Sequence, residues 1–268
     1  MHADIALTTP YMIARIEGAI GWMIFNNPER RNAVKAAMWE AIPAIMDRFE
    51  ADPNVRVIVI RGAGDTTFIA GADISEFEVH RASPAALAKY EANADTAAHR
   101  IAHSPLPSIA MIRGWCIGGG VGLALDCDLR IAADGSKFGV PATRLGLGYW
   151  ASGVKRLMDV VGPAHVKEIF YTARHFSAAE ALAMGLVNRV VAEPELEAYV
   201  RSYCAMIADN APLTIRAVKR TVDELSRSST AADIAECDRL VQLCFDSDDY
   251  IEGRRAFMEK RRPTFTGR

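Results

Sequence analysis

Several features that define common functional classes are missing from this sequence of 268 residues. No apolar run approaches the roughly 18 residues that a membrane-spanning helix needs. The N-terminal segment lacks the apolar core of a signal peptide and any Arg- and Ser-rich stretch, so we expect no targeting segment. Lys and Arg number 31 against 33 Asp and Glu, and the charges are mixed along the chain. This excludes the basic stripe typical of nucleic-acid binding, and we expect neither a nucleic-acid nor a membrane partner.

Cysteines are few, odd in number and without Cys-x-x-Cys spacing. Zinc ligation and a disulfide framework are therefore both disfavoured, and we expect a reducing, cytoplasmic location and no metal site. The five are Cys116, Cys127, Cys204, Cys237 and Cys244.

Common glycine motifs are absent as well. The stretch 118–125 does not fit G-x-G-x-x-G because Leu123 stands where the third glycine belongs. The sequence contains no P-loop, no G-x-S-x-G and no H-E-x-x-H motif. Nucleotide-binding, serine-hydrolase and zinc-protease interpretations therefore lack their residues.

Alternating strand and helix patterns predict an α/β core with both sheet faces covered. A helical pattern runs from Asn32 to Phe49, and we expect Pro43 to kink it or end it early. Ser177 and Glu180 form a capping box before a short helix. Strands are predicted at 12–17, 19–26, 56–61, 108–113, 128–132 and 186–191, and further helices at 84–103, 151–161 and 163–172.

The pattern after Glu193 is helical only. We therefore divide the chain into a core of residues 1–195 and a C-terminal helical region of residues 196–268. Apolar stripes such as Val218, Val222 and Leu225 have no sheet of their own to cover, so this region is expected to pack on a neighbouring subunit.

Two segments of small residues are the best candidates for a site: 68–74 (FIAGADI) and 114–120 (GWCIGGG). We expect each to follow a buried strand directly. The triple glycine also opens a helix, where free N–H groups favour negative charge. One N–H from each turn would make an oxyanion hole, in which a single donor is worth about 2.7–4 kcal/mol to a transition state. The alternative is that both are merely tight connections.

At this point the sequence resembles the crotonase (enoyl-CoA hydratase/isomerase) superfamily over nearly its whole length. The resemblance is carried by the two turns and by several further segments. These are NNP (26–28), RNA (31–33), FGVPATRLGLG (138–148), TARHFSAAEALAMGLVNRVV (172–191) and AFMEKRRPTF (256–265).

The resemblance implies a crotonase-like β-β-α spiral with a C-terminal helical layer that builds homotrimers, commonly paired into homohexamers. It implies oxyanion-hole donors at Ala72 and Gly119 for an acyl-CoA thioester, with CoA arriving as part of the substrate and no separate cofactor. CoA contacts are implied for Arg30, Arg31, Ala33 and Ala70, and for Phe257 and Lys260 of a neighbouring subunit.

The departures from the family pattern concern its chemistry. Hydratases of this family carry two glutamates, and here the corresponding positions are Gly122 and Ala142. Water addition needs a base and an acid, which neither residue supplies. A dehalogenase-type reaction needs an aspartate where Trp150 stands, so Trp150 is expected to shape the pocket wall instead.

Three residues are candidates to replace the glutamates. Asp126 lies one helical turn after Gly122, but the sequence favours a structural acid near Asp128 over a site residue here. Tyr149 occupies the place of a tyrosine in the methylmalonyl-CoA decarboxylase branch, which the tail also resembles; a packed tyrosine is the alternative. That branch has histidine at Ala72 and glutamate at Gly122. His80 is the third candidate.

Two functional classes stay open. The first is an acyl-CoA enzyme that stabilises an enolate, as a lyase or isomerase but not a standard hydratase, with a decarboxylase using Tyr149 as one form. The second is a non-catalytic acyl-CoA-binding protein. RNA binding, known for one branch of the family, needs a lysine-rich helix at 84–104, where only Lys89 and Arg100 are basic.

Overall fold

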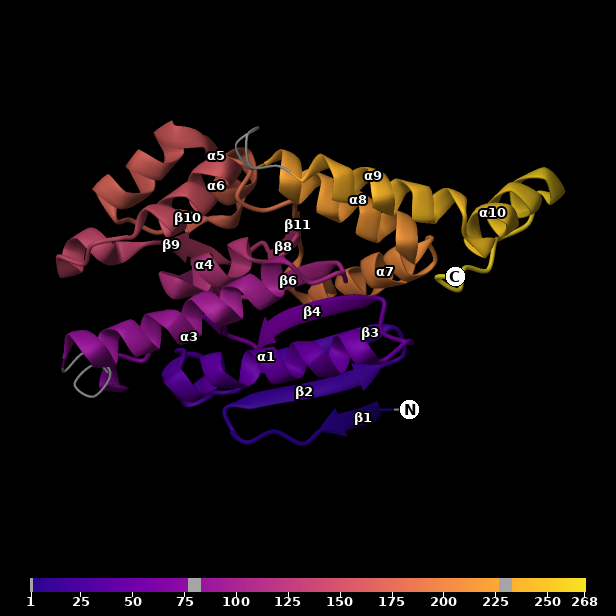
Figure 1. Cartoon of the computed structure of the whole chain (residues 1–268). Helices are drawn as coiled ribbons and strands as arrows, with labels where there is room; N and C mark the ends of the chain where they lie inside the picture. Colours follow the sequence, from indigo (N-terminus) through magenta and orange to yellow (C-terminus); the bar gives the residue numbers. More distant parts are fainter. Residues whose placement is uncertain (1, 77–82, 227–232) are drawn as a thin grey trace.

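The computed structural model describes residues 2–76, 83–226 and 233–268. Its larger sheet has seven strands in the order β1-β2-β3-β4-β6-β8-β11 (Figure 1). The pairs β1–β2 and β2–β3 are antiparallel, and all later pairs are parallel. The strands are β1 (His2–Ile5), β2 (Met12–Glu17), β3 (Ile20–Phe25), β4 (Val57–Gly62), β6 (Ser108–Ile112), β8 (Leu129–Ala133) and β11 (Arg189–Val191).

A second, smaller sheet was not predicted from the sequence. Its order is β10-β9-β7-β5, with β7 parallel to both β9 and β5. Each strand has only two or three residues, too few to show an alternating pattern. They are β5 (Thr67–Ile69), β7 (Trp115–Ile117), β9 (Lys137–Gly139) and β10 (Phe176–Ser177).

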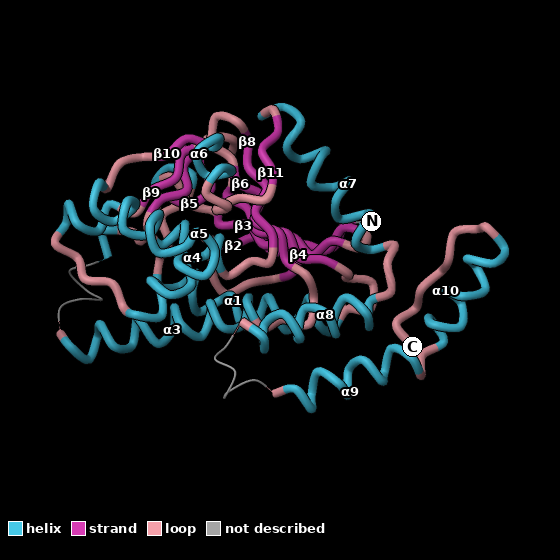
Figure 2. Tube along the Cα trace, turned by 90° about the horizontal axis from the view of Figure 1, so that it is seen from above, coloured by secondary structure: helices cyan, strands magenta, loops and turns pink. Residues whose placement is uncertain are grey.

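Helices cover both faces of the larger sheet (Figure 2). Because successive strand residues point to opposite faces, Ile58 and Ile60 of β4 join the core under α1 (Ala36–Ala51). Val57 and Val59 join the opposite core, with α7 (Leu196–Ala208). The helix α3 (Pro84–Ala102) packs along α1. The α/β prediction with covered faces is thus confirmed.

Pro43 does not end α1 early, so that part of the prediction is wrong: the helix runs from Ala36 to Ala51 with Pro43 inside it. Proline in a helix interior removes the hydrogen bond to the carbonyl of residue 39 and crowds it. The helical residues on either side of the proline include Ile42, Ile45 and Phe49, whose side chains are completely buried. Burial of one such side chain is worth about 1.5–3 kcal/mol, so together they outweigh the cost of the proline.

The remaining core elements follow the sequence prediction closely. The helix α5 (Ala151–Thr172) is interrupted at Gly162, whose φ of 77° is non-helical. Ser177 caps α6 (Ala178–Ala183) in a capping box with Glu180. The last predicted strand, 186–191, is formed only at Arg189–Val191. Short 3₁₀ turns lie at Pro28–Arg30, Ile74–Glu76, Pro141–Leu145 and Glu193–Glu195.

The C-terminal part contains α8 (Pro212–Leu225), α9 (Ile234–Phe245) and α10 (Asp248–Glu259). In both views α10 lies at the end of the molecule away from α3 and α5 (Figures 1 and 2). Among described helices, none is long and apolar enough to cross a membrane. The division of the chain at residue 195 stays a prediction. The first helix of the predicted C-terminal region, α7, packs on the larger sheet of the core.

Candidate active site

The two glycine-containing turns lie side by side because β5 and β7 are parallel neighbours. Thr67 pairs with Trp115 and Ile69 with Cys116, so both strands end at the same edge of the small sheet. The prediction that each segment follows a buried strand directly holds for 114–120, which begins two residues after β6 ends. It is wrong for 68–74, because residues 63–67 with the start of β5 lie between this segment and β4. This small sheet is what brings the two turns together.

Glycine is required on both sides of this contact. Gly71 has a φ of +98° and Gly118 a φ of +55°, conformations that side chains disfavour. Gly120, at the start of α4 (Gly119–Leu125), sits so close to β5 that an added Cβ would lie 2.2 Å from the Ile69 carbonyl oxygen. The chain therefore holds the start of α4 firmly against the first turn.

Ala72 and Gly119 present backbone N–H groups at this contact. Val34 donates to the Gly71 carbonyl and accepts from Asp73, so the Ala72 N–H points away from that bridge. Gly119 is the first residue of α4 and has no intrahelical acceptor. A Cβ built on Gly119 would lie 3.9 Å from the Ala72 nitrogen. In the described part of the chain, neither N–H is found donating to another protein atom.

The segment predicted to contact CoA lies against the first turn. The Ala70 N–H donates to the Arg31 carbonyl at 3.1 Å. Buried Asn32 ties the segment to β5, donating to the Thr67 carbonyl at 2.8 Å. Arg30 and Arg31 are exposed, whereas Ala33 is buried. The structure thus brings these four predicted CoA residues into one loop pair beside Ala72.

An ion pair fixes the other side of the first turn. Lys35 lies 3.1 Å from the buried Asp73 carboxylate. Burial acts to raise the pKa of Asp73, but hydrogen bonds from Ser75 and Lys35 prevail and hold it below its usual value. The carboxylate is charged at neutral pH and anchors the chain directly after Ala72.

Beside the second turn lies a cavity of about 180 Å³, lined by Gly119, Gly122 and Tyr149 among others. A Cβ built on Gly122 meets nothing within 4 Å, so open space adjoins the position where the family resemblance implies a glutamate. The Tyr149 ring packs edge-to-face on Phe170, with centroids 4.9 Å apart, and is 39% exposed. Burial raises the pKa of Tyr149, so its hydroxyl stays protonated at neutral pH.

Asp126 lines the same cavity and forms an ion pair with Arg156 of α5. Burial raises the pKa of Asp126 to about 6, an effect that the neighbouring Arg156 partly opposes. The pair was missed in the sequence because Arg156 lies 30 residues further on. The only local signal for a functional role was the acidic Asp126 itself, at the end of a helix, α4, whose other buried residues are apolar or glycine.

Other residues considered from the sequence lie elsewhere. Ala142 is buried but does not line the cavity, although Val140 does. Trp150 does not line it either: this residue is 71% exposed and its indole donates to Glu91, so the prediction of a pocket-wall role was wrong. His80 lies outside the described residues. Among the described residues, no group of three or more His, Cys, Asp or Glu side chains could hold a metal ion.

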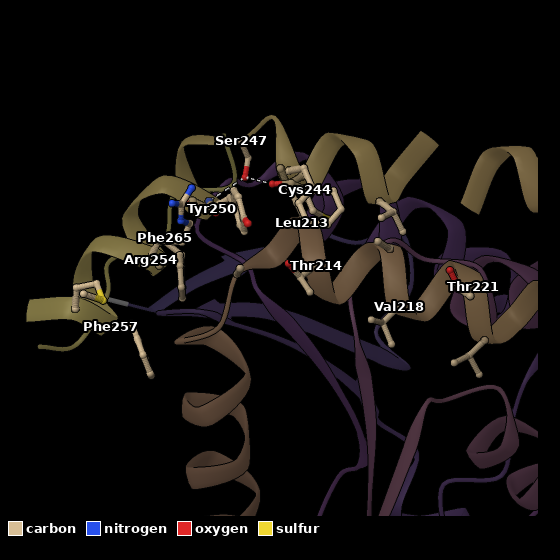
Figure 3. Close-up of a pocket in the computed structure, with 18 residues that line it drawn as sticks. Leu213, Thr214, Val218, Thr221, Cys244, Ser247, Tyr250, Arg254, Phe257 and Phe265 are labelled. Carbon is tan, nitrogen blue, oxygen red and sulfur yellow. Dashed lines mark hydrogen bonds between the residues drawn. The ribbon is translucent and has the colours of Figure 1, made fainter. Parts of the chain in front are cut away.

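Phe257 and Lys260 are not brought to this site within one chain. Both lie at the end of α10, where Phe257 is 83% exposed. The α10 side chains instead border an apolar groove of about 1120 Å³ against α8. Figure 3 shows Val218 of α8 and Phe257 of α10 on its rim, with Tyr250 and Phe265 between them.

Comparison with known proteins gives a consistent picture. A sequence model described as enoyl-CoA hydratase/isomerase matches residues 15–268. The chain is 34% identical over 255 residues to a crotonyl-CoA hydratase of Syntrophomonas wolfei, covering 95% of this chain and 97% of that protein. It is 30% identical over 251 residues to a short-chain-enoyl-CoA hydratase of Clostridium acetobutylicum, covering 94% and 95%.

Solved structures agree with the sequence relatives. An enoyl-CoA hydratase/carnithine racemase from Magnetospirillum magneticum superposes with a TM-score of 0.91 at 35% identity, covering 98% of this chain and 97% of that one. A putative enoyl-CoA hydratase/isomerase family protein from Hyphomonas neptunium gives 0.90 at 38%, covering 96% and 98%. With its paired turns and spiral of two sheets, this chain belongs to the enoyl-CoA hydratase/isomerase family of the crotonase superfamily.

Proposed function

We propose that the cavity binds an acyl-CoA thioester and that the N–H groups of Ala72 and Gly119 stabilise the enolate of that thioester. The observation that carries the proposal is the contact between the two turns beside the start of α4, where neither donor has a protein acceptor among the described residues. Developing negative charge on a thioester oxygen would gain both donors and the helix dipole. CoA would arrive with the acyl group, held by the loop of Arg30, Arg31, Ala33 and Ala70.

The proposed reaction is not hydration by a pair of carboxylates. Gly122 leaves open space where an acid would stand, and Ala142 is buried and cannot exchange a proton. Hydration requires a group to activate water and another to protonate the α-carbon. An enolate-forming lyase or isomerase that needs less acid–base assistance fits this cavity better.

A decarboxylase is the second candidate, because Tyr149 lines the same cavity as Gly119. In such a reaction the bond between the α-carbon and the carboxylate breaks, CO₂ leaves, and the electron pair passes into the enolate. The enolate then takes a proton at its α-carbon. The neutral Tyr149 hydroxyl would orient the carboxylate or supply that proton.

The test is incubation with crotonyl-CoA, methylmalonyl-CoA and malonyl-CoA, with products followed by mass spectrometry. Tyr149→Phe is compared with Tyr171→Phe, which makes the same change at a residue that is 76% exposed on α5 and outside the cavity. Turnover of a carboxylated thioester that falls only in Tyr149→Phe supports the decarboxylase. Efficient hydration of crotonyl-CoA would contradict the reasoning from Gly122 and Ala142. Binding without turnover favours a non-catalytic acyl-CoA-binding protein.

We also propose that the chain assembles as a homotrimer or a pair of trimers through α8–α10, the part of the 196–268 region that extends beyond the sheet. Its supporting observation is apolar exposure: Val218 and Val222 on α8 are 57% and 56% exposed. In the assembly, Phe257 and Lys260 would reach the CoA of a neighbouring subunit. A cytoplasmic location is likewise proposed, since all five cysteines are free thiols.

A further inference from the structure

The cavity beside the second turn is apolar along most of its wall and charged at one end. Trp39, Leu157 and Phe170 are among its apolar lining residues. The charged end combines Asp126 with Arg156 of α5 and Asp95 of α3. Asp126 is only 6% exposed, whereas the Arg156 side chain is 38% exposed. Both members of the pair also line an outer groove, so the guanidinium keeps contact with solvent.

The helix geometry sets how far this charged end lies from the reacting thioester. Asp126 follows Gly119 by seven residues and keeps helical dihedral angles, so it lies on the same face of α4, about 10 Å further along the axis. A thioester held at Gly119 has its α- and β-carbons within a few ångströms of that N–H. Asp126 also lies one helical turn beyond Gly122, the position of the family's glutamate, so its carboxylate lies further from those carbons than that glutamate would. It stands beside the far part of the acyl chain.

The pair has hydrogen-bonding capacity left over. Its contact with Arg156 uses Oδ1 of Asp126, which leaves Oδ2 to accept another hydrogen bond. A guanidinium has five N–H donors, and in the described residues Asp126 is the partner found for Arg156. Burial and the nearby Asp95 raise the pKa of Asp126 to about 6, and Arg156 opposes this rise. Because this pKa lies below 7, the carboxylate is mostly ionised at neutral pH.

Three kinds of acyl end group can be compared against this wall. A hydrocarbon end would displace water from the ion pair without forming a hydrogen bond in its place. A carboxylate would add a negative charge where two acids already face one arginine. A hydroxyl group can donate to Asp126 and accept from Arg156 at once.

We propose that the Asp126–Arg156 pair is a specificity determinant that selects acyl-CoA thioesters bearing a hydroxyl group several carbons from the thioester. The proposal rests on the thioester site proposed above and names the substrate class of that site. The small volume of the cavity, below the roughly 300 Å³ at which drug-sized pockets begin, limits the chain to a short one.

The test uses saturated thioesters, which bind without reacting at a double bond. Hexanoyl-CoA, 6-hydroxyhexanoyl-CoA and adipoyl-CoA are compared by titration calorimetry at pH 7.5, together with the four- and eight-carbon members of each series. At the matching length, the hydroxyacyl thioester is expected to bind about tenfold more tightly than the alkyl one, the lower range for a hydrogen bond to a charged group. The dicarboxylic thioester is expected to bind most weakly.

Two variants and a control check the role of the pair. Asp126→Leu should reverse the preference in favour of hexanoyl-CoA. Asp126→Asn, which keeps the shape if the leucine variant fails to fold, removes one of the two acids beside Arg156 and should raise the affinity for adipoyl-CoA severalfold. Asp159→Asn, whose acid lines the outer groove and not the cavity, should leave the ranking unchanged.

The outcomes separate this inference from the proposed function. Equal binding of hydroxyacyl and alkyl thioesters at every length, or an unchanged affinity for adipoyl-CoA in Asp126→Asn, would overturn the specificity assignment alone. If no acyl-CoA of any kind binds, the thioester site itself is wrong and this inference fails with it.

Discussion

Gly120 and Gly122 stand two residues apart on α4, and alanine at each should have opposite effects. A Cβ at position 120 would lie 2.2 Å from the Ile69 carbonyl oxygen and 3.0 Å from the Ile69 Cβ. At position 122 the same atom meets nothing within 4 Å. Both changes improve helix propensity equally, so the difference between them measures how tightly α4 is held against β5.

The expected magnitudes differ in sign. Gly122→Ala should stabilise the protein by about 0.5–1 kcal/mol, the usual gain for this change in a helix. Gly120→Ala should cost about 3 kcal/mol, the upper end of overpacking penalties, because a backbone carbonyl must move. At roughly 2–4 °C per kcal/mol, Tm should rise by a few degrees in the first variant and fall by at least about 6 °C in the second.

The assay is thermal unfolding at one fixed protein concentration, since subunit association also shifts Tm. Acyl-CoA binding gives a second readout: Gly120→Ala should lose affinity even while folded, because the Gly119 N–H moves with the helix start. Equal changes in Tm for the two variants would refute the close contact between α4 and β5, and with it the positioning of the two donors.

Three further predictions follow from the fold and the charges. Pro43→Ala should stabilise the protein by about 1–2 kcal/mol, because the Trp39 carbonyl regains its helical partner; lower stability in urea would contradict this. The pKa of Asp126 rises on folding from about 3.9 to about 6, so the native state binds that proton more tightly than the unfolded state. This contribution to the free energy of unfolding is fully present below about pH 4 and is lost as the pH rises through 6. Unfolding of Asp126→Asn should lack this loss between pH 4.5 and 7.5, and an unchanged pH dependence would refute the assignment. Val222→Asp should dissociate the assembly in sedimentation velocity, since it places a charge on an exposed apolar face; an unchanged sedimentation coefficient would exclude α8 from the interface.

Much of the fold was readable from the sequence because its long elements carry strong patterns. The strand at Val57–Gly62 and the helix breaker at Gly162 were both predicted within a residue or two. The small sheet was missed, because strands as short as Thr67–Ile69 show no alternation. Pro43 misled the helix prediction because local propensity cannot weigh the burial that α1 gains as a whole.

The site was predictable in part for a similar reason. The two turns stood out as runs of small residues, but their contact depends on pairing between β5 and β7, which lie more than 40 residues apart. Motif resemblance supplied Ala72 and Gly119, and the structure places both at that contact. The Asp126–Arg156 pair had no such motif, and only the packing of α4 on α5 brings its members together.

The arrangement also explains how such a site can lose its acids and keep its pocket. The two proposed donors belong to the backbone, and glycine geometry together with the pairing of β5 and β7 holds them in place. Neither depends on a side chain at position 122 or 142. Glycine in place of the family's glutamate at position 122 would therefore remove acid–base chemistry and leave the two proposed donors in position. What the chain does to a bound thioester must then be decided by the side chains that still line the cavity, Tyr149 near the turn and the charged pair at its far end.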